Sequence, residues 1–428
     1  FPYIAGENGG GAFVLIYLVC ILIIGFPIMV SEIMLGRRGR RNPITSMKIL
    51  GQEEQGNEAW KYVGLIGLMA GFIILSYYSV IAGWTLHYFK LSIFGELSNL
   101  DNETAQSIFG QLTASASTQL IYHTFFMLIT IGIISKGIKD GLERSVKLMM
   151  PGLLLILIIL LLYSVFQGDF MAGVNFLLIP DFSKVTPQSV LAAMGQAFFT
   201  LSLGMGCIVM YGAYLPKNES IVGTTTTIIF CDTMIALLAG MVIFPIVFQF
   251  GLKPTDGPGL IFLTLPLAFN EITGGYIFSG LFFILLAFAA ITSALSLLEP
   301  SVAWMIENKS YSRTKSAFII GLLIWSLGFL TIFSFNILSE FNFCEIRSCN
   351  DDWKGTLFDN FDHIASNIML PLSGLLFTIF ASWVMKRKHS MDELSDIPVN
   401  VYRLWRFSAR YIAPIGVILV FLNAIGLI

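Results

Sequence analysis

Long apolar segments alternate with short polar ones along almost the whole chain. A helix needs about 20 apolar residues to cross a bilayer. We expect ten full membrane spans, and residues 1–10 are expected to be a fragment of another whose missing half would complete an eleven-span protein. The predicted full spans are residues 11–36, 60–94, 119–136, 141–166, 187–214, 219–252, 276–308, 312–335, 358–386 and 404–428.

The composition supports this pattern. Hydrophobic residues make up 56% of the 428 residues and charged residues only 12%, whereas soluble domains carry about 25% charged residues. A soluble fold with this balance would expose apolar side chains everywhere, so the chain is predicted to be a multi-pass membrane protein. The net charge of −2 gives no basic field, and nucleic acid is not an expected partner.

The basic residues predict the orientation of the spans. If the spans alternate in direction, most of the 25 Lys and Arg residues lie on one side of the membrane. Loops rich in Lys and Arg stay in the cytoplasm, so this side is predicted to be cytoplasmic. The first residues of the chain then lie outside, and a complete first span gives a cytoplasmic N-terminus. On the outer side, Cys344 and Cys349 share one polar loop and either form a disulfide or stay free.

The middle of the predicted span 187–214 is unusually polar. Residues 198–206 (Phe-Phe-Thr-Leu-Ser-Leu-Gly-Met-Gly) contain two hydroxyl side chains and two glycines. This composition suits an unwound helix whose free carbonyls bind a cation and whose half-helix N-terminus faces an anion. It also suits a continuous helix that packs closely through its glycines. The residues alone leave both structures open.

Other polar groups lie inside predicted spans. Asp232 needs a cation, a proton or hydroxyl donors, because a lone charge in a span is costly. Thr292 and Ser293 offer hydroxyls that suit Na⁺, although such groups also bond back to their own helix. Tyr77 and Tyr78 need hydrogen-bond partners at mid-depth, or belong to the core or the interfacial aromatic belt.

Nothing in the sequence suggests catalysis. It offers no nucleophile–base pair, no histidine spacing typical of metal ligands and no phosphate-binding loop. Asp392, Glu393 and Asp396 lie in a polar loop and are expected to form a solvated face. An enzyme is therefore not expected, and the available chemistry is the coordination of ions and solutes.

Several motifs, in order along nearly the whole chain, resemble the neurotransmitter:sodium symporter family. They are Phe-Pro-Tyr at 1–3 with Glu-Asn-Gly-Gly-Gly-Ala-Phe at 7–13, Glu32 with Gly-Arg at 36–37, Tyr77 and Tyr78 with Trp84, Phe-Phe-Thr-Leu-Ser at 198–202, and Ile-Thr-Ser at 291–293. The match looks most like the hydrophobic amino acid transporters of the bacterial branch.

The resemblance implies an all-α polytopic membrane protein with a LeuT-type fold. In this fold, spans 1–5 and 6–10 form a 5+5 inverted repeat and helices 1 and 6 are broken. The first repeat (spans 1b–5) would cover residues 1–166 and the second (spans 6–10) residues 187–386. Residues 404–428 would be an additional span 11, and the first half of span 1 is absent from this sequence.

The resemblance also implies two Na⁺ sites. Site 1 would take Thr200 and Asp232. Site 2 would take the carbonyl of Ala289 and the hydroxyls of Thr292 and Ser293. Both sites would also take ligands from the first half of span 1.

The implied substrate pocket is largely apolar. Tyr78 is expected to donate its hydroxyl to the substrate carboxylate, and Phe199 to cover the site from outside. Met205 is flexible and adapts to several apolar shapes, so large hydrophobic L-amino acids such as Trp, Tyr, Phe and Leu are expected. The implied substrate-binding residues are Ile74, Tyr78, Phe199, Thr200, Ser202, Met205, Ser293, Ala294 and Leu297.

The family's outer gate would consist of Phe199, Gln196 and Asp362. The arginine that pairs with this aspartate in the family would lie immediately before Phe1.

The inner gate and coupling residues would be Tyr214, Glu307, Glu32, Gly141 and Pro151. Of these, the glutamate of the second span has an alternative interpretation as a helix cap near the basic residues 37–41. The Gly and Pro of the fifth span resemble a family segment that unwinds to admit water to site 2.

These features predict a symporter that imports large hydrophobic L-amino acids with two Na⁺ ions by alternating access. Asp232 stands where chloride-dependent relatives carry Asn, and a fixed carboxylate can replace the charge of chloride, so transport is expected to be chloride-independent. The alternatives are an amine or osmolyte symporter of the same family and an amino-acid receptor that does not transport; a channel is a more distant one. The expected location is the bacterial inner membrane, with the substrate and the bilayer as the only expected partners.

Overall fold

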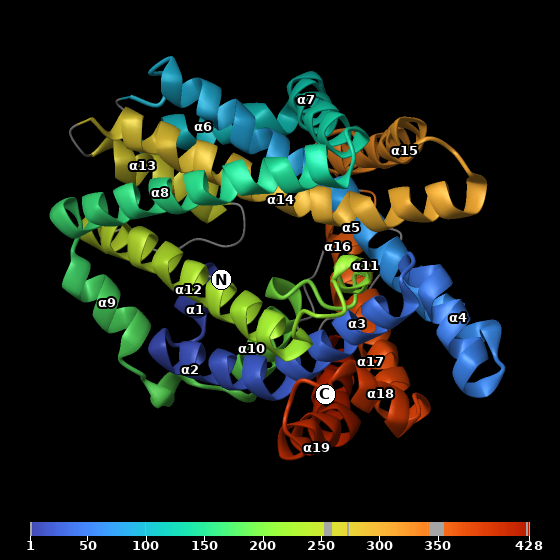
Figure 1. Cartoon of the computed structure of the whole chain (residues 1–428). Coiled ribbons are helices and arrows are strands. Elements are labelled where there is room, and N and C mark those ends of the chain that lie inside the picture. The colour runs from blue at the N-terminus through green and yellow to red at the C-terminus, as the bar shows by residue number, and fades with distance from the viewer. Residues whose placement is uncertain are drawn as a thin grey trace.

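The computed structural model describes residues 2–98, 100–251, 259–271, 274–339, 341, 355–424 and 427, and among these residues it contains helices but no strand (Figure 1). The all-α fold class is therefore confirmed. The proposed pairing of Cys344 with Cys349 falls outside the described residues.

Among the described residues, nine helices are long and apolar enough to cross a membrane. Each coincides with one of the predicted spans, which confirms the multi-pass architecture. They are Gly11–Gly39 (α2 Gly11–Cys20, η1 Ile21–Gly25, α3 Phe26–Gly39), Glu58–Ile93 (η2 Glu58–Trp60, α5 Lys61–Ile93), Ala116–Ser135 (α7), Ile138–Gln167 (η3 Ile138–Glu143, α8 Arg144–Gln167), Ile221–Gln249 (α12), Gly275–Lys309 (α14), Arg313–Ser334 (α15), Leu357–Val384 (α16 Leu357–Asp362, η6 His363–Met369, α17 Leu370–Ile379, η7 Phe380–Val384) and Val399–Ala424 (α19 Val399–Phe407, η8 Ser408–Ile412, α20 Ala413–Ala424).

The remaining predicted span, 187–214, is a broken helix. Its first half, α10 (Pro187–Thr200), starts with the Thr186 hydroxyl accepting the backbone N–H of Ser189 at 3.1 Å, and Pro187 occupies the first turn. The second half, α11 (Cys207–Tyr214), begins only after the non-helical residues 201–206. The broken helix that the resemblance implied is therefore present, and a continuous glycine-packed helix is excluded.

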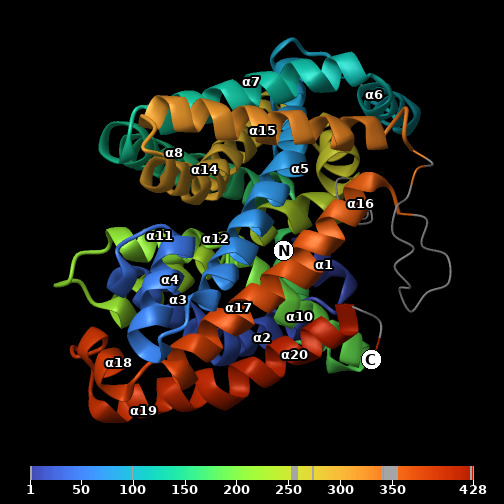
Figure 2. The ribbon, with the colours of Figure 1, turned by 90° about the vertical axis from the view of Figure 1, so that its right-hand side faces the viewer.

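Short helices join these segments, and the long helices form two groups. Figures 1 and 2 show α7, α8, α14 and α15 on one side of the molecule and α2, α3, α10, α11, α17 and α20 on the other, with α5 crossing between the groups. The break between α10 and α11 lies beside α5. The short helices are α1 (Pro2–Glu7), α4 (Pro43–Gln55), α6 (Asn102–Ala114), α9 (Phe170–Leu178), η4 (Phe182–Lys184), η5 (Leu260–Thr264) with α13 (Leu265–Asn270), and α18 (Arg387–Glu393).

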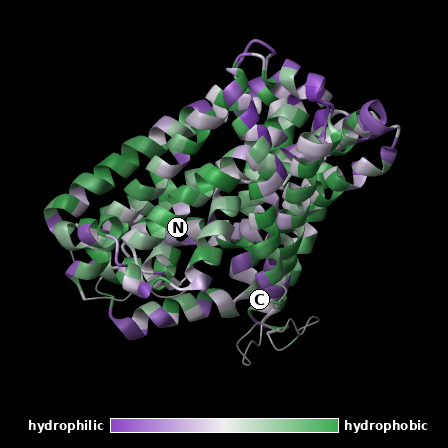
Figure 3. Ribbon diagram, turned by 90° about the horizontal axis from the view of Figure 1, so that it is seen from below, coloured by the Kyte–Doolittle hydropathy of each residue, from purple (hydrophilic) through white to green (hydrophobic). Residues whose placement is uncertain are grey.

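The surface of the fold is apolar where lipid would contact it. Large side chains such as Leu22, Leu155 and Phe166 point outward, which a soluble protein would avoid. Hydrophilic residues concentrate at helix ends and in loops (Figure 3). This distribution agrees with a helix bundle whose sides face a bilayer.

Candidate functional site

The break in the sixth span depends on backbone conformations that most residues avoid. Gly204 and Gly206 have φ values of 77° and 75°, and Ser202 has a φ of 54°. A helix cannot continue through left-handed residues. The chain instead closes a tight turn, in which the Ser202 N–H donates to the carbonyl of Phe199 at 3.0 Å. The Leu203 N–H also bonds within the turn, to the carbonyl of Phe198 at 3.2 Å, whereas the backbone groups of Gly204 are free to bind partners outside the helix.

Two side chains from other spans hold the turn in place. The N–H of Gly204 donates to Oε1 of Glu32 at 2.7 Å, and its carbonyl accepts from the Ser373 hydroxyl at 2.5 Å. Glu32 is completely buried, and its second oxygen has no hydrogen-bond partner among the described residues. The glutamate therefore belongs to the break, and its interpretation as a cap near residues 37–41 is wrong.

The proposed ligands of Na⁺ site 1 lie together. The Thr200 hydroxyl, at the last turn of α10, donates to Oδ2 of Asp232 in α12 at 3.0 Å. Tyr17, fully buried in α2, also faces both residues. The sequence had not indicated this tyrosine, because only the packing of α2 against α10 brings it there. A carboxylate and two hydroxyls are oxygen ligands of the kind that hard cations prefer.

The proposed ligands of site 2 lie close together along α14, within residues 289–293. The Thr292 hydroxyl donates to the carbonyl of Ala289 at 2.9 Å, which is the back-bonded arrangement that the sequence left open. The carbonyl keeps a second lone pair, and the hydroxyl keeps its own. The neighbouring Ser293 is exposed and lies near the Tyr78 hydroxyl on α5. The two helices thus present polar groups to the same space.

An apolar wall lies beside these polar groups. Ile74, Met205, Ala294 and Leu297 are buried in one hydrophobic cluster, and Tyr78 packs against it. The cluster joins α5, the break and α14, which are far apart in the sequence. Four of the expected pocket residues therefore share one hydrophobic cluster, and Met205 and Leu297 both lie beside Gly71 of α5.

The three expected outer-gate residues line one cavity of about 550 Å³. Gln196 and Phe199 contribute from α10 and Asp362 from α16, and the phenylalanine side chain is 43% exposed. The aspartate is held by the hydroxyl of Tyr77, at 2.7 Å, and of Ser366, at 2.8 Å. The partner that Tyr77 needs is therefore the gate aspartate.

The expected inner-gate residues have separate partners. Tyr214 donates its hydroxyl to Oε1 of Glu299 at 2.7 Å, and Arg313 binds the same carboxylate through two nitrogens. Glu307 instead accepts from the backbone and side-chain nitrogens of Asn42 at 3.1 and 2.7 Å. The sequence analysis missed Glu299, although an acidic residue deep in an apolar segment is itself a signal.

The Gly141–Pro151 segment is helical in this structure. Gly141 lies in η3, where a Cβ atom would come 2.1 Å from the carbonyl oxygen of Ile133 in α7. Pro151 lies inside α8, where it removes one helix hydrogen bond. The segment is thus continuous but contains a wide turn and a missing bond.

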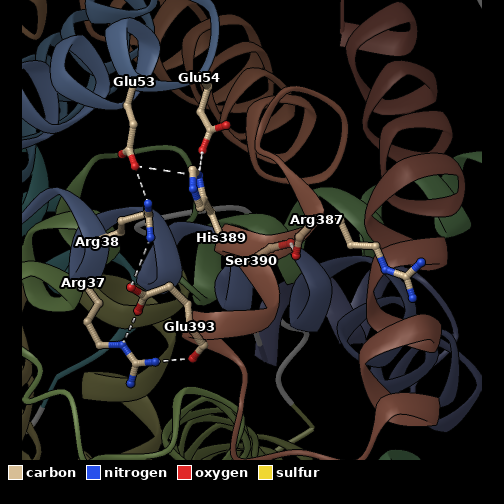
Figure 4. Close-up of polar contacts among 8 residues, drawn as sticks. All are labelled: Arg37, Arg38, Glu53, Glu54, Arg387, His389, Ser390 and Glu393. Atoms are coloured by element: carbon tan, nitrogen blue, oxygen red, sulfur yellow. Dashed lines mark hydrogen bonds and ion pairs between the residues drawn. The ribbon is translucent and has the colours of Figure 1, made fainter.

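An ion-pair cluster joins the ends of several spans (Figure 4). Arg37 at the end of α3 binds Glu393 of α18 at 2.8 Å, and Arg38 binds Glu53 of α4. His389 of α18 contacts Glu54 at 2.5 Å. The expectation that Glu393 belongs to a solvated face is therefore wrong, because this carboxylate is only 13% exposed and is paired. We call these contacts between α3, α4 and α18 the α18 latch.

Oxygen-rich clusters around a broken membrane helix define an ion-coupled membrane transporter rather than an enzyme. The model of the Sodium:neurotransmitter symporter family matches residues 1–107 and 108–427. The chain belongs to this family.

Relatives and solved structures agree. The chain is 37% identical to an uncharacterized sodium-dependent transporter, YhdH, of Bacillus subtilis (strain 168), over 100% of this chain and 93% of that protein. It is 33% identical to an uncharacterized sodium-dependent transporter of Haemophilus influenzae, over 99% and 92% of the two chains. It is also similar to the crystal structure of MhsT in complex with L-phenylalanine, with a TM-score of 0.88 and 40% identity over 99% of this chain and 93% of the other. The family, the LeuT-type fold and sodium dependence are thereby confirmed.

Proposed function

We propose that this sodium-dependent transporter imports large hydrophobic L-amino acids together with two Na⁺ ions. The observation that carries the proposal is the convergence of three elements at the break. Thr200 at the end of α10 contacts Asp232 of α12, and Tyr78, Met205 and Leu297 belong to or pack against the hydrophobic cluster that includes the break. A zwitterion with a large apolar side chain has matching parts, and MhsT, a 40% identical protein, binds L-phenylalanine.

Each part of the substrate has an assigned partner in this proposal. The carboxylate takes the Tyr78 hydroxyl and completes Na⁺ site 1 at Thr200 and Asp232. The side chain fills the space beside Met205 and Leu297. Ser202 and Ser293 supply the remaining polar edge, and site 2 forms at residues 289–293.

Two ions suffice for strong accumulation. Each Na⁺ that crosses ~100 mV contributes about 2.3 kcal/mol, and a tenfold concentration gradient contributes about 1.4 kcal/mol. Two ions therefore supply roughly 7 kcal/mol, which corresponds to about 10⁵-fold accumulation at the limit. One ion would limit accumulation to a few hundredfold, so the number of coupled ions determines whether the protein can take up amino acids that are scarce outside the cell.

Alternating access would proceed by closing the outer cavity over Phe199 and opening the inner side near Tyr214 and Glu307. The helix bundle that contains the break would rock inward relative to the rest of the fold. We place the protein in the bacterial inner membrane with a cytoplasmic N-terminus, because most of its basic residues then lie inside. Amino acid, Na⁺ and lipid are the only partners that the proposal requires.

The test is uptake of labelled Trp and Leu into proteoliposomes of the full-length protein, with an inward Na⁺ gradient and a K⁺ control. Na⁺-dependent accumulation above equilibrium supports the proposal. Na⁺-dependent binding without accumulation would indicate a receptor, and the absence of both would indicate an amine or osmolyte substrate. Met205→Gly, which removes one side chain of the apolar wall and enlarges the space for the substrate, should shift the preference toward larger amino acids without removing the Na⁺ dependence.

Transport is expected to be independent of chloride. The Asp232 carboxylate already supplies a negative charge beside the proposed site 1, so a mobile anion adds little. Initial uptake rates in NaCl and in sodium gluconate should agree within about twofold, whereas Asp232→Asn should lose uptake in gluconate. A chloride requirement of the unmodified protein would contradict this prediction.

Pro151→Ala is expected to slow the release of Na⁺ to the inside by several-fold. The substitution restores one hydrogen bond to α8 and favours the closed helix next to Gly141. The measurement is Na⁺ efflux, or accessibility of a cysteine label on the inner side, in reconstituted protein. Pro245→Ala, near the C-terminal end of α12, is the control for removing a helix proline elsewhere. Equal effects of both variants would mean that Pro151 has no special role in Na⁺ release.

A further inference from the structure

The boundary between the tenth and eleventh spans contains a pocket that the transport site does not use. It has a volume of about 610 Å³, and no carboxylate is among its described lining residues. Its lining residue Arg387 belongs to α18, the helix that also carries Glu393 and His389 of the α18 latch. The lining residues are Arg387, Tyr402, Arg403, Arg406, Phe407, Arg410 and Tyr411.

Two of the four arginines have fixed positions. Arg406 donates to the hydroxyls of Ser390 and Tyr402 at 2.9 and 2.7 Å. Arg410 donates to the carbonyl of Ser382 at 2.7 Å and stacks on the ring of Trp383 at 4.8 Å. A guanidinium has five N–H donors, so each keeps donors for a ligand.

The other two arginines have no partner. The side chains of Arg387 and Arg403 are exposed and have no hydrogen bond or ion pair among the described residues. Figure 4 shows Arg387 pointing away from Glu393 and His389, which the α18 latch occupies. Four like charges around one pocket repel each other unless an anion lies between them.

The same segment is built to lie at the edge of a bilayer. Helix α19 buries Tyr402 and Trp405 against the protein and exposes Leu404 and Phe407, which are 68% and 56% exposed. As the first turns of the spanning helix Val399–Ala424, α19 would lie at headgroup level with these apolar side chains toward the acyl chains. An anion bound to these arginines would therefore lie next to the acyl-chain region, as the headgroup of a lipid does.

We propose that this pocket binds the phosphodiester headgroup of an anionic phospholipid. The guanidinium groups of Arg387, Arg403, Arg406 and Arg410 would bind its phosphate oxygens, since planar N–H pairs match phosphate geometry. Leu404, Phe407 and Tyr411 would contact the acyl chains. Basic pockets between spans, on the side richest in Lys and Arg, suit such headgroups.

The test is native mass spectrometry of the delipidated full chain in detergent, with dioleoyl-phosphatidylglycerol and dioleoyl-phosphatidylcholine added separately. We expect one phosphatidylglycerol to bind with at least tenfold preference over phosphatidylcholine. The double variant R387Q/R403Q, which breaks no described contact, should lower the affinity for phosphatidylglycerol by about 30-fold. The matched control K217Q/K309Q removes two exposed basic residues outside the pocket and should change it less than twofold.

Three outcomes would overturn the proposal. The first is an equal loss of phosphatidylglycerol affinity in R387Q/R403Q and in the control, which would indicate diffuse electrostatic attraction. The second is equal binding of both lipids. The third is displacement of the lipid by 10 mM inorganic phosphate, which would indicate a site for free anions. Thermal unfolding in detergent alone checks that R387Q/R403Q is folded. If the double variant fails that check, the single variants R387Q and R403Q are each expected to lower affinity about fivefold.

Discussion

Gly204→Ala is expected to reduce Na⁺-dependent amino acid uptake by about 30-fold or more. A left-handed alanine costs about 1–2 kcal/mol, and forcing extra atoms into a packed site costs about 1–3 kcal/mol. At this position the new Cβ would lie 2.3 Å from the carbonyl oxygen of Leu370 and 2.9 Å from the Ser373 hydroxyl. The turn that forms the break must shift, and the bonds to Glu32 and Ser373 shift with it.

Gly132→Ala in α7 is the matched control, because nothing lies within 4 Å of its Cβ position and it is helical. This variant should transport normally. The measurement is the initial rate of Na⁺-dependent uptake, normalised to folded protein by size-exclusion chromatography. If Gly204→Ala transports as well as Gly132→Ala, the geometry of the break is not essential to function.

Glu299→Ala is expected to destabilise the protein by about 3–5 kcal/mol. The Glu299 side chain is only 1% exposed and binds both Arg313 and Tyr214. Its removal leaves a largely buried guanidinium without a counter-charge and a tyrosine hydroxyl without an acceptor. Thermal unfolding in detergent should therefore show a marked fall in Tm.

The double variant Glu299→Leu with Arg313→Met tests the cause, because replacing a buried pair with apolar residues is often neutral. It should recover most of the lost stability. Glu143→Ala, which removes the exposed partner of Lys147, should leave Tm unchanged. A small fall in Tm for Glu299→Ala would mean that the Glu299–Arg313 pair contributes little to the stability of the fold.

The membrane architecture could be predicted from the sequence because apolar length is a local property. Nine predicted spans appear as continuous helices among the described residues. The broken span was ambiguous on residues alone, since two glycines fit both a break and a close contact. The resemblance to a family resolved it, and the positive φ of Ser202 shows why composition could not.

Partners across the bundle could not be predicted in the same way. The family resemblance assigned Asp232 and Thr200 to one site, but it did not indicate Tyr17 beside them. It grouped Glu307 with Tyr214, whereas Asn42 and Glu299 are the partners that the fold provides. Which carboxylate faces which hydroxyl depends on how helices rotate about their axes, and one sequence contains little information about that rotation.

Two of the contacts described above restrict how the second and tenth spans can move. Gly204 is hydrogen-bonded to Glu32 of the second span and to Ser373 of the tenth, so it links these two spans. The ion pair between Arg37 and Glu393 in the α18 latch lies about one helix turn further along the second span. Two points of attachment define a line. While both hold, rotation about that line is the single rigid-body degree of freedom left between these segments. The corner formed by α17 and α18 therefore follows the second span in every movement except rotation about that line.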